Sequence, residues 1–482
     1  MNKLLVIVSV CLVTCGHSDA QTNQPNIVFI MVDDLGWADV GYNNPYIISP
    51  TIDGLARDGV IFNQAYVHPA CTPTRGSFMT GYFAHRTGLQ HDVLNRHWPT
   101  GLPLNFTTLP EKLQEEGYTT YMVGKWHLGY CNYDYTPNGR GFDHFYGYYS
   151  GTHDYFNHTV GQNHLDLRED LVPDRDQKGV YSTYLFGEKA AEYVANHDNS
   201  KPLFMFFSTQ SVHLPLQVPD FYLNKYEFVK NDNRRKLMAM VTALDDSIAT
   251  VVKALKEHGL WDNTLLIFQS DNGGSSKDDH MSINWPLRGG KKTLWEGGNR
   301  VVTFAHGNML ENVSYVNEEM IHVVDWFPTL VKLAGGNTDP DMDGVDVWDT
   351  IAKGDPSPRT EFVYNIDVWQ DDRSEAIRVG DYKLIKGRIR HPSNWVPPPE
   401  SYCSGDEFEK GQVWGIVELL YNIKDDPTEH NDLSEEMPEK VAELAARLDA
   451  HRLKVVQPIQ GTPNYAVSSP DNFCGVYSPG WC

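Results

Sequence analysis

The sequence predicts an α/β layered fold, in which a large central mixed sheet is flanked by helices. Short apolar runs end abruptly in polar residues at 26–32, 118–123, 203–207 and 264–268. Continuous apolar runs of this length are typical of strands that are buried on both faces of a parallel sheet. Helical patterns lie between the runs, at 109–117, 187–197 and 234–259. Alternating strands and helices indicate an α/β architecture, and ligands in such folds gather beyond the carboxyl ends of the strands.

A second, smaller domain is predicted toward the C-terminus. The composition shifts between Gly335 and Pro358 to a stretch rich in Gly, Asp and Pro. Beyond it, the runs 376–385 and 413–421 and a helix over 439–453 indicate an α+β domain with an antiparallel sheet. We therefore divide the chain into a signal peptide (1–20), a catalytic domain (21–355) and a smaller domain (356–482). The irregular stretch around Pro397-Pro398-Pro399 is a candidate loop at the mouth of the site.

The first twenty residues indicate secretion. Lys3 precedes an apolar stretch from Leu4 to Thr14 that is too short to span a bilayer, and Ser18 and Ala20 form a small-x-small cleavage pattern. The alternative, a buried first strand, leaves this segment without a partner. No later run is long and apolar enough for a membrane helix. We expect a protein of the secretory pathway, lysosomal or extracellular, with no membrane partner.

Charge and cysteine content narrow the function further. The 482 residues include 63 acidic and 40 basic side chains, a net charge of −23, which argues against nucleic-acid binding. Three glycosylation sequons begin at Asn105, Asn157 and Asn312, although such tripeptides also arise by chance.

Five cysteines follow the predicted signal, so one does something other than pair. If that one is Cys71, two disulfides form in one of three pairings among Cys131, Cys403, Cys474 and Cys482.

Oxygen ligands follow two of the predicted strands. Asp33 and Asp34 end the first run, and Asp271 and Asn272 follow the fourth. Oxygen-only ligation suits calcium or magnesium, and no Cys/His spacing suggests zinc. The alternative is that these residues only cap helices or turns. Adjacent acids at a strand end repel each other unless a positive charge lies between them, which favours the metal.

Basic and titratable side chains follow the other runs. Lys125 and His127 lie two apart, so in an extended segment they face the same way and would bind an anion and move a proton. His213 follows the third run, and Lys291 lies in a basic stretch. Each alone has an ordinary structural alternative, a solvated lysine or a hydrogen-bonded histidine.

The segment Cys71 to Gly76 combines a cysteine with an arginine before a predicted helix. A helix N-terminus favours negative charge, and Arg75 adds a fixed bidentate donor. The segment therefore indicates an anion site that contains a nucleophile. The alternative is an ordinary buried cysteine.

These residues resemble a known family. Cys71-Thr72-Pro73-Thr74-Arg75, followed by Thr80-Gly81, is similar to the signature of the type I sulfatases. Further blocks resemble that family in the expected order: Asp33-Asp34, Gly124 to Gly129, His213, Ser270 to Gly273, Gly290-Lys291 and Trp295 to Gly298. Within the family the chain is most similar to the arylsulfatase B branch, the N-acetylgalactosamine-4-sulfatases. Two departures are Tyr82, where many members have arginine, and Thr74, where serine is more usual.

The resemblance implies an alkaline-phosphatase-like fold and a sulfatase mechanism. Cys71 would be converted by a formylglycine-generating enzyme to formylglycine, whose hydrate attacks a sulfate ester of a carbohydrate or an aryl alcohol and gives a sulfated enzyme intermediate. The implied calcium ligands are Asp33, Asp34, Cys71 (as formylglycine), Asp271 and Asn272. The implied charge-stabilising and proton-transfer residues are Arg75, Lys125, His127, His213 and Lys291, of which Lys125, His213 and Lys291 also bind substrate. The alternatives are a phosphoesterase or phosphonate hydrolase of the same superfamily, and a catalytically silent sulfate-binding protein.

Overall fold

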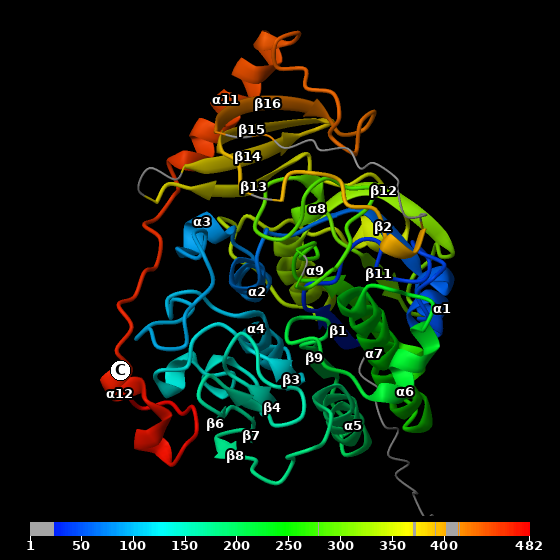
Figure 1. Cartoon of the computed structure of the whole chain (residues 1–482), viewed down its shortest axis with the longest axis vertical. Coiled ribbons are helices and arrows are strands. Elements are labelled where there is room, and N and C mark those ends of the chain that lie inside the picture. Colours follow the sequence, from blue (N-terminus) through cyan, green and yellow to red (C-terminus); the bar gives the residue numbers. More distant parts are fainter. Residues whose placement is uncertain (1–23, 278, 370–372, 391, 402–412, 414) are drawn as a thin grey trace, which may run out of the picture.

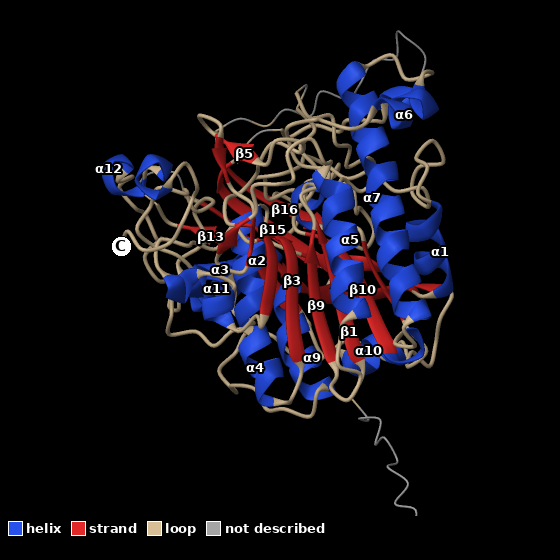
Figure 2. Cartoon of the chain, turned by 90° about the horizontal axis from the view of Figure 1, so that it is seen from below, coloured by secondary structure: helices blue, strands red, loops and turns tan. Residues whose placement is uncertain are grey.

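The computed structural model describes residues 24–277, 279–369, 373–390, 392–401, 413 and 415–482. The predicted signal peptide and Cys403 lie outside the described residues. The chain forms a large mixed sheet between helices and a separate small antiparallel sheet, as predicted (Figures 1 and 2). In the described part of the chain, no helix is both long and apolar enough to cross a membrane.

The central sheet has ten strands, in the order β12-β2-β11-β10-β1-β9-β3-β4-β7-β8. Its parallel centre is formed by the four predicted strands, β10 (Thr264–Ser270), β1 (Asn26–Val32), β9 (Leu203–Ser208) and β3 (Thr119–Lys125), together with β4 (His144–Tyr148). The flanking strands are β2 (Val60–Tyr66), β11 (Thr303–His306), β12 (Tyr315–His322), β7 (Arg168–Glu169) and β8 (Val172–Pro173). A separate two-stranded ribbon joins β5 (Thr159–Val160) and β6 (His164–Leu165). β11 runs antiparallel to both neighbours, which makes the sheet mixed.

The two faces of β1 lie in different hydrophobic clusters, because successive side chains of a strand point in opposite directions. Val28, Ile30 and Val32 pack with the face covered by α1 (Pro50–Asp58), α5 (Ser182–Ala195) and α7 (Asp232–Glu257). The intervening side chains of β1 pack with the face covered by α2 (Cys71–Thr80), α4 (Leu109–Glu115) and α9 (Trp326–Leu333). Burial on both faces explains why these strands read as unbroken apolar runs.

The second sheet is antiparallel and contains β13 (Glu361–Asp367), β14 (Ser374–Val379), β15 (Tyr382–Arg388) and β16 (Ile416–Asn422). The run predicted at 376–385 is a hairpin of β14 and β15 rather than one strand, because Gly380 adopts a positive φ at the turn. One face of this sheet packs on α11 (Pro438–Arg452). The other face packs its Phe362 and Tyr364 against Tyr66 of the central sheet.

The last thirty residues return to the first domain, along its left side in Figure 1. After α11, the Val456 N–H donates to the His85 carbonyl, and Val476 pairs with Leu165. The end of the chain is held by a disulfide between Cys131 and Cys482. Of the two disulfides that were predicted, the described residues contain this one. Cys474, which was expected to pair, is free and exposed.

Candidate active site and metal centre

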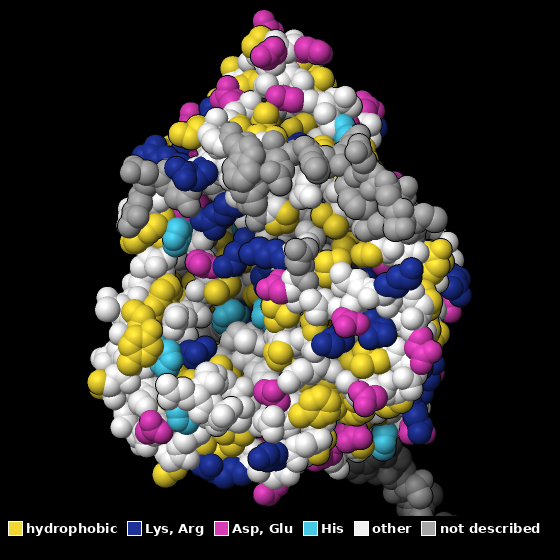
Figure 3. All heavy atoms as spheres, in the orientation of Figure 1, with side chains coloured by type: hydrophobic (Ala, Val, Ile, Leu, Met, Phe, Trp, Pro, Cys, Tyr) yellow, Lys and Arg dark blue, Asp and Glu magenta, His cyan; other side chains and the backbone are white. Residues whose placement is uncertain are grey.

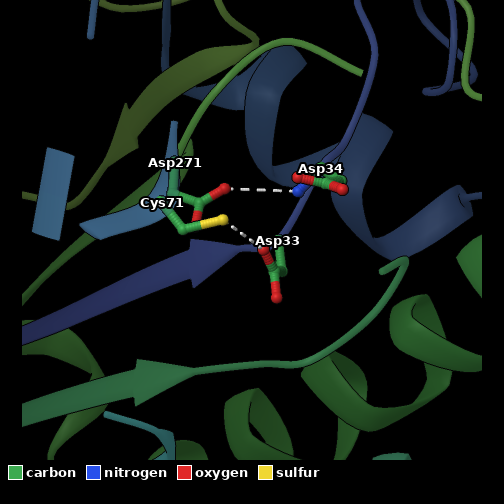
Figure 4. Close-up of side chains that lie close together, drawn as sticks. All are labelled: Asp33, Asp34, Cys71 and Asp271. Carbon is green, nitrogen blue, oxygen red and sulfur yellow. Dashed lines mark hydrogen bonds between the residues drawn. The ribbon is translucent and has the colours of Figure 1, made fainter. Parts of the chain in front are cut away.

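The carboxyl ends of four strands, β1, β3, β9 and β10, meet at one point. β1 ends at Val32 and is followed by Asp33 and Asp34, and β10 ends at Ser270 and is followed by Asp271. Figure 4 shows the three carboxylates and Cys71 close together, and one ligand atom from each lies within 4.8 Å of the others. The Asp34 N–H donates to Asp271 Oδ1 at 3.2 Å, so the two strand ends are joined directly.

Cys71 is the first residue of α2 and is buried. Its Sγ donates to Asp33 Oδ1 at 3.5 Å. Burial, reinforced by Asp271, raises the pKa of the thiol to about 12. A helix N-terminus alone favours the thiolate, but here desolvation and the carboxylates outweigh it. The unmodified thiol is therefore protonated at physiological pH and is a weak nucleophile.

Each carboxylate has a cationic partner. Lys125 Nζ lies 2.6 Å from Asp33 Oδ2, and both side chains are fully buried. Lys291 Nζ lies 2.6 Å from Asp34 Oδ1. Burial alone would raise the pKa of Asp34, but Lys291 and two histidines hold it far below its usual range.

Arg75 pairs with the third carboxylate. Its Nε and Nη2 donate to Asp271 Oδ2 at 3.0 and 2.9 Å, and Nη1 donates to the Lys125 carbonyl and to Ser208 Oγ. Burial and the neighbouring Asp33 nevertheless raise the pKa of Asp271 to about 6. The guanidinium thus ties the ends of β10, β3 and β9 together.

Two predicted histidines lie at the same point. His127 has a positive φ of 59°, which turns the chain out of β3, and its ring packs against Gly151, where a Cβ would lie 2.6 Å from Cε1. His213 Nε2 lies 3.7 Å from Asp34 Oδ2. Burial and the nearby lysines lower the pKa of His127 far below its usual value, and burial and Lys291 lower that of His213 to about 3. Both rings are therefore neutral.

The sequence did not single out His280 or Ser208. His280 is buried, its Nε2 lies 2.8 Å from the Val212 carbonyl, and its Nδ1 lies 3.7 Å from Asp34 Oδ2. It comes from an irregular loop, where no periodicity or strand end marks a residue. Ser208 is the last residue of β9, and its position at a strand end was an available signal.

The donor set fits a hard divalent cation. Asn272 Nδ2 donates to Asp34 Oδ1 at 2.7 Å, while the buried Asn272 Oδ1 has no hydrogen-bond partner in the described part of the chain. An orphaned carbonyl oxygen beside three carboxylates is typical of a calcium or magnesium site. The structure brings together all ten predicted residues: Asp33, Asp34, Cys71, Arg75, Lys125, His127, His213, Asp271, Asn272 and Lys291.

The fold and the sequence comparisons identify the protein as a sulfuric ester hydrolase. The Sulfatase family model matches residues 25–336, and the chain belongs to that family. Arylsulfatase J of Mus musculus is 40% identical over 95% of this chain and 81% of its own length. N-acetylgalactosamine-6-sulfatase of the same organism is 27% identical over 96% of this chain and 92% of its own. The crystal structure of Ps i-CgsB with k-i-k-neocarrahexaose has a TM-score of 0.77 and 28% identity, and covers 90% of this chain and 94% of that one.

Proposed function

We propose that this protein hydrolyses the sulfate ester of a carbohydrate, with formylglycine made from Cys71 and one calcium ion. The observation that carries the proposal is the placement of Cys71 within 4.8 Å of the carboxylates of Asp33, Asp34 and Asp271. The names of N-acetylgalactosamine-6-sulfatase and of the k-i-k-neocarrahexaose complex support a saccharide over a simple aryl sulfate. The protein would require a formylglycine-generating enzyme during its maturation.

The side chains divide the chemistry among them. Calcium would be held by Asp33, Asp34, Asp271, Asn272 and the modified residue 71, and would lower the cost of ionising the aldehyde hydrate. Lys125, Lys291 and Arg75, which pair with the three carboxylates, would stabilise the charge that the sulfuryl oxygens gain. Lys291, with the neutral His213 beside it, would stabilise the negative charge on the leaving ester oxygen. The neutral His127 would take the proton that must leave before sulfate is released.

The two alternative functions are less well supported. A two-zinc phosphoesterase needs histidine ligands, whereas the cluster found among the described residues holds three aspartates and one cysteine. A silent sulfate-binding protein needs the cations but has no use for a protonated cysteine beside the carboxylates.

The proposed route through the secretory pathway is supported by the surface. All three sequon asparagines, Asn105, Asn157 and Asn312, are exposed, so oligosaccharyltransferase products there would not disturb the core. We propose glycosylation at these sites and a lysosomal or extracellular destination.

The mass of the peptide that contains Cys71, taken from protein secreted by a eukaryotic host, tests the proposal. We expect an aldehyde or its hydrate; an unmodified thiol in an active preparation refutes the mechanism. Cys71→Ser is the companion experiment. The serine oxygen bonds to sulfur as the ester oxygen leaves, but serine has no second hydroxyl through which to expel sulfate. We expect a stable adduct of one sulfuryl group on Ser at position 71, and full multiple turnover would contradict the proposal.

A further inference from the structure

A small polar pocket adjoins the candidate active site on the side of the second sheet. Pro69, Ala70 and Pro73, which flank Cys71, form one wall of it, and Lys292, the neighbour of Lys291, forms another. The Lys292 N–H donates to the Pro69 carbonyl at 2.7 Å, which closes the corner between these walls. Figure 3 shows Lys and Arg side chains along one rim of a hollow that contains histidine side chains.

Two of the residues that line this pocket each carry a buried acceptor oxygen that has no partner among the described residues. These oxygens are Gln90 Oε1 and Asn365 Oδ1, and their residues are only 2% and 6% exposed. Gln90 Nε2 donates to the Val456 carbonyl at 2.8 Å, and Asn365 Nδ2 donates to the Gln90 carbonyl at 2.9 Å. A carbonyl only accepts, so these two bonds fix both amide orientations and turn both oxygens away from their anchors.

The remaining charges of the pocket are already paired. Lys292 Nζ lies 3.0 Å from Asp92 Oδ1, and His91 Nδ1 and Arg390 Nη2 lie 2.8 and 3.2 Å from Asp367 Oδ2. Among the described residues that line the pocket, each positive charge is paired, so the pocket favours a neutral hydrogen-bond donor over a second anion. Its volume of about 20 Å³ admits one group of the size of a water molecule and is too small for a sugar ring.

We propose that Gln90 and Asn365 form a recognition subsite that accepts a hydroxyl or amide N–H of the saccharide whose sulfate lies at Cys71. This inference rests on the proposed function. The sugar ring would stay in the open hollow, and only its donor group would enter the pocket. A substrate that supplies the donor gains a hydrogen bond that a substrate without the donor cannot make.

The test compares kcat/KM for nitrophenyl sulfate with kcat/KM for N-acetylgalactosamine 4-sulfate, N-acetylgalactosamine 6-sulfate and glucosamine 6-sulfate. The ratio of the best sugar to the aryl ester is the readout. We expect Gln90→Met and Asn365→Leu each to lower this ratio about fivefold, the loss of one neutral hydrogen bond. Asn138→Leu is the matched control, because Asn138 Oδ1 is also buried without a partner but lies outside the pocket.

Each outcome is decisive. Equal losses on both substrate types, or an unchanged ratio in Gln90→Met, overturn the subsite, since the pocket would then serve packing or hold only water. A wild-type enzyme that hydrolyses nitrophenyl sulfate and none of the three sugars also overturns the subsite and leaves sulfate ester hydrolysis intact. An enzyme that hydrolyses no sulfate ester at all overturns the proposed function itself.

Discussion

Replacing Arg75 with methionine tests how the candidate active site is held together. The guanidinium makes four hydrogen bonds, two of them to Asp271 Oδ2, and both side chains of this ion pair are fully buried. Methionine fills similar space but makes none of these bonds. Asp271 would then lie beside Asp33 with no direct partner of opposite charge.

The expected loss of stability depends on pH, because Asp271 becomes neutral when it binds a proton and an unpaired buried charge is then avoided. Breaking a buried ion pair from one side costs about 3–5 kcal/mol when the remaining charge stays ionised. The pKa of Asp271 is already raised to about 6 with Arg75 present, and it would rise further without it. The folded variant therefore binds more protons than the unfolded chain above pH 3.8, and its stability falls as pH rises through the folded pKa. We expect a loss of about 3–5 kcal/mol at pH 7.5 and about 1–2 kcal/mol, the hydrogen bonds alone, at pH 5.

Differential scanning calorimetry in the presence of a chelator measures this loss of stability, because no bound metal then compensates the charge of Asp271. At about 2.1 cal/mol/K per residue, the entropy of unfolding is about 1 kcal/mol/K for the mature chain, so Tm should fall by about 3–5 °C at pH 7.5. Arg447→Met is the control, because Arg447 pairs with Glu361 with 57% of its side chain exposed and should cost less than about 1 kcal/mol. Equal shifts for the two variants at pH 7.5, or a larger loss for Arg75→Met at pH 5, would refute the reasoning.

Three further results are expected. Burial raises the pKa of Glu429 to about 7, despite the Lys383 ammonium 2.8 Å away, so the contribution of Glu429 to stability is lost as pH rises from about 4.5 to 7. Glu429→Gln should therefore make Tm less dependent on pH over that window, and an unchanged slope of Tm against pH would contradict this. Cys482→Ser opens a loop with a sequence separation of 351 residues and should lower stability by about 6 kcal/mol in the loop-entropy model, whereas Cys474→Ser, at a free exposed thiol, should leave Tm unchanged. Asn272→Leu removes the unpaired Oδ1 and should weaken calcium affinity at least tenfold, as measured by isothermal titration calorimetry. An undiminished affinity would contradict the assignment of Asn272 as a calcium ligand.

The sequence predicted the centre of the fold because that part is buried on both faces. β1 was predicted with its observed bounds, and β9 and β10 to within two residues, since most of their buried side chains are apolar. The edge strand β12 was missed because its outer residues, such as Glu318, face solvent and interrupt the apolar pattern. α5 was predicted five residues too late, because its first turn is rich in polar and aromatic side chains.

The sequence by itself singled out the carboxylates, cations and histidines that meet at the candidate active site, since each stands at the end of a recognisable run or in a family motif. Only the tertiary structure decided how they are used. It paired Lys125 with Asp33 and Lys291 with Asp34, and it raised the pKa of Cys71 by burial. It also brought His280 to the site, and Gln90 and Asn365 to the pocket beside it. Burial and contact between distant segments arise only when the layers pack, and no local periodicity encodes them.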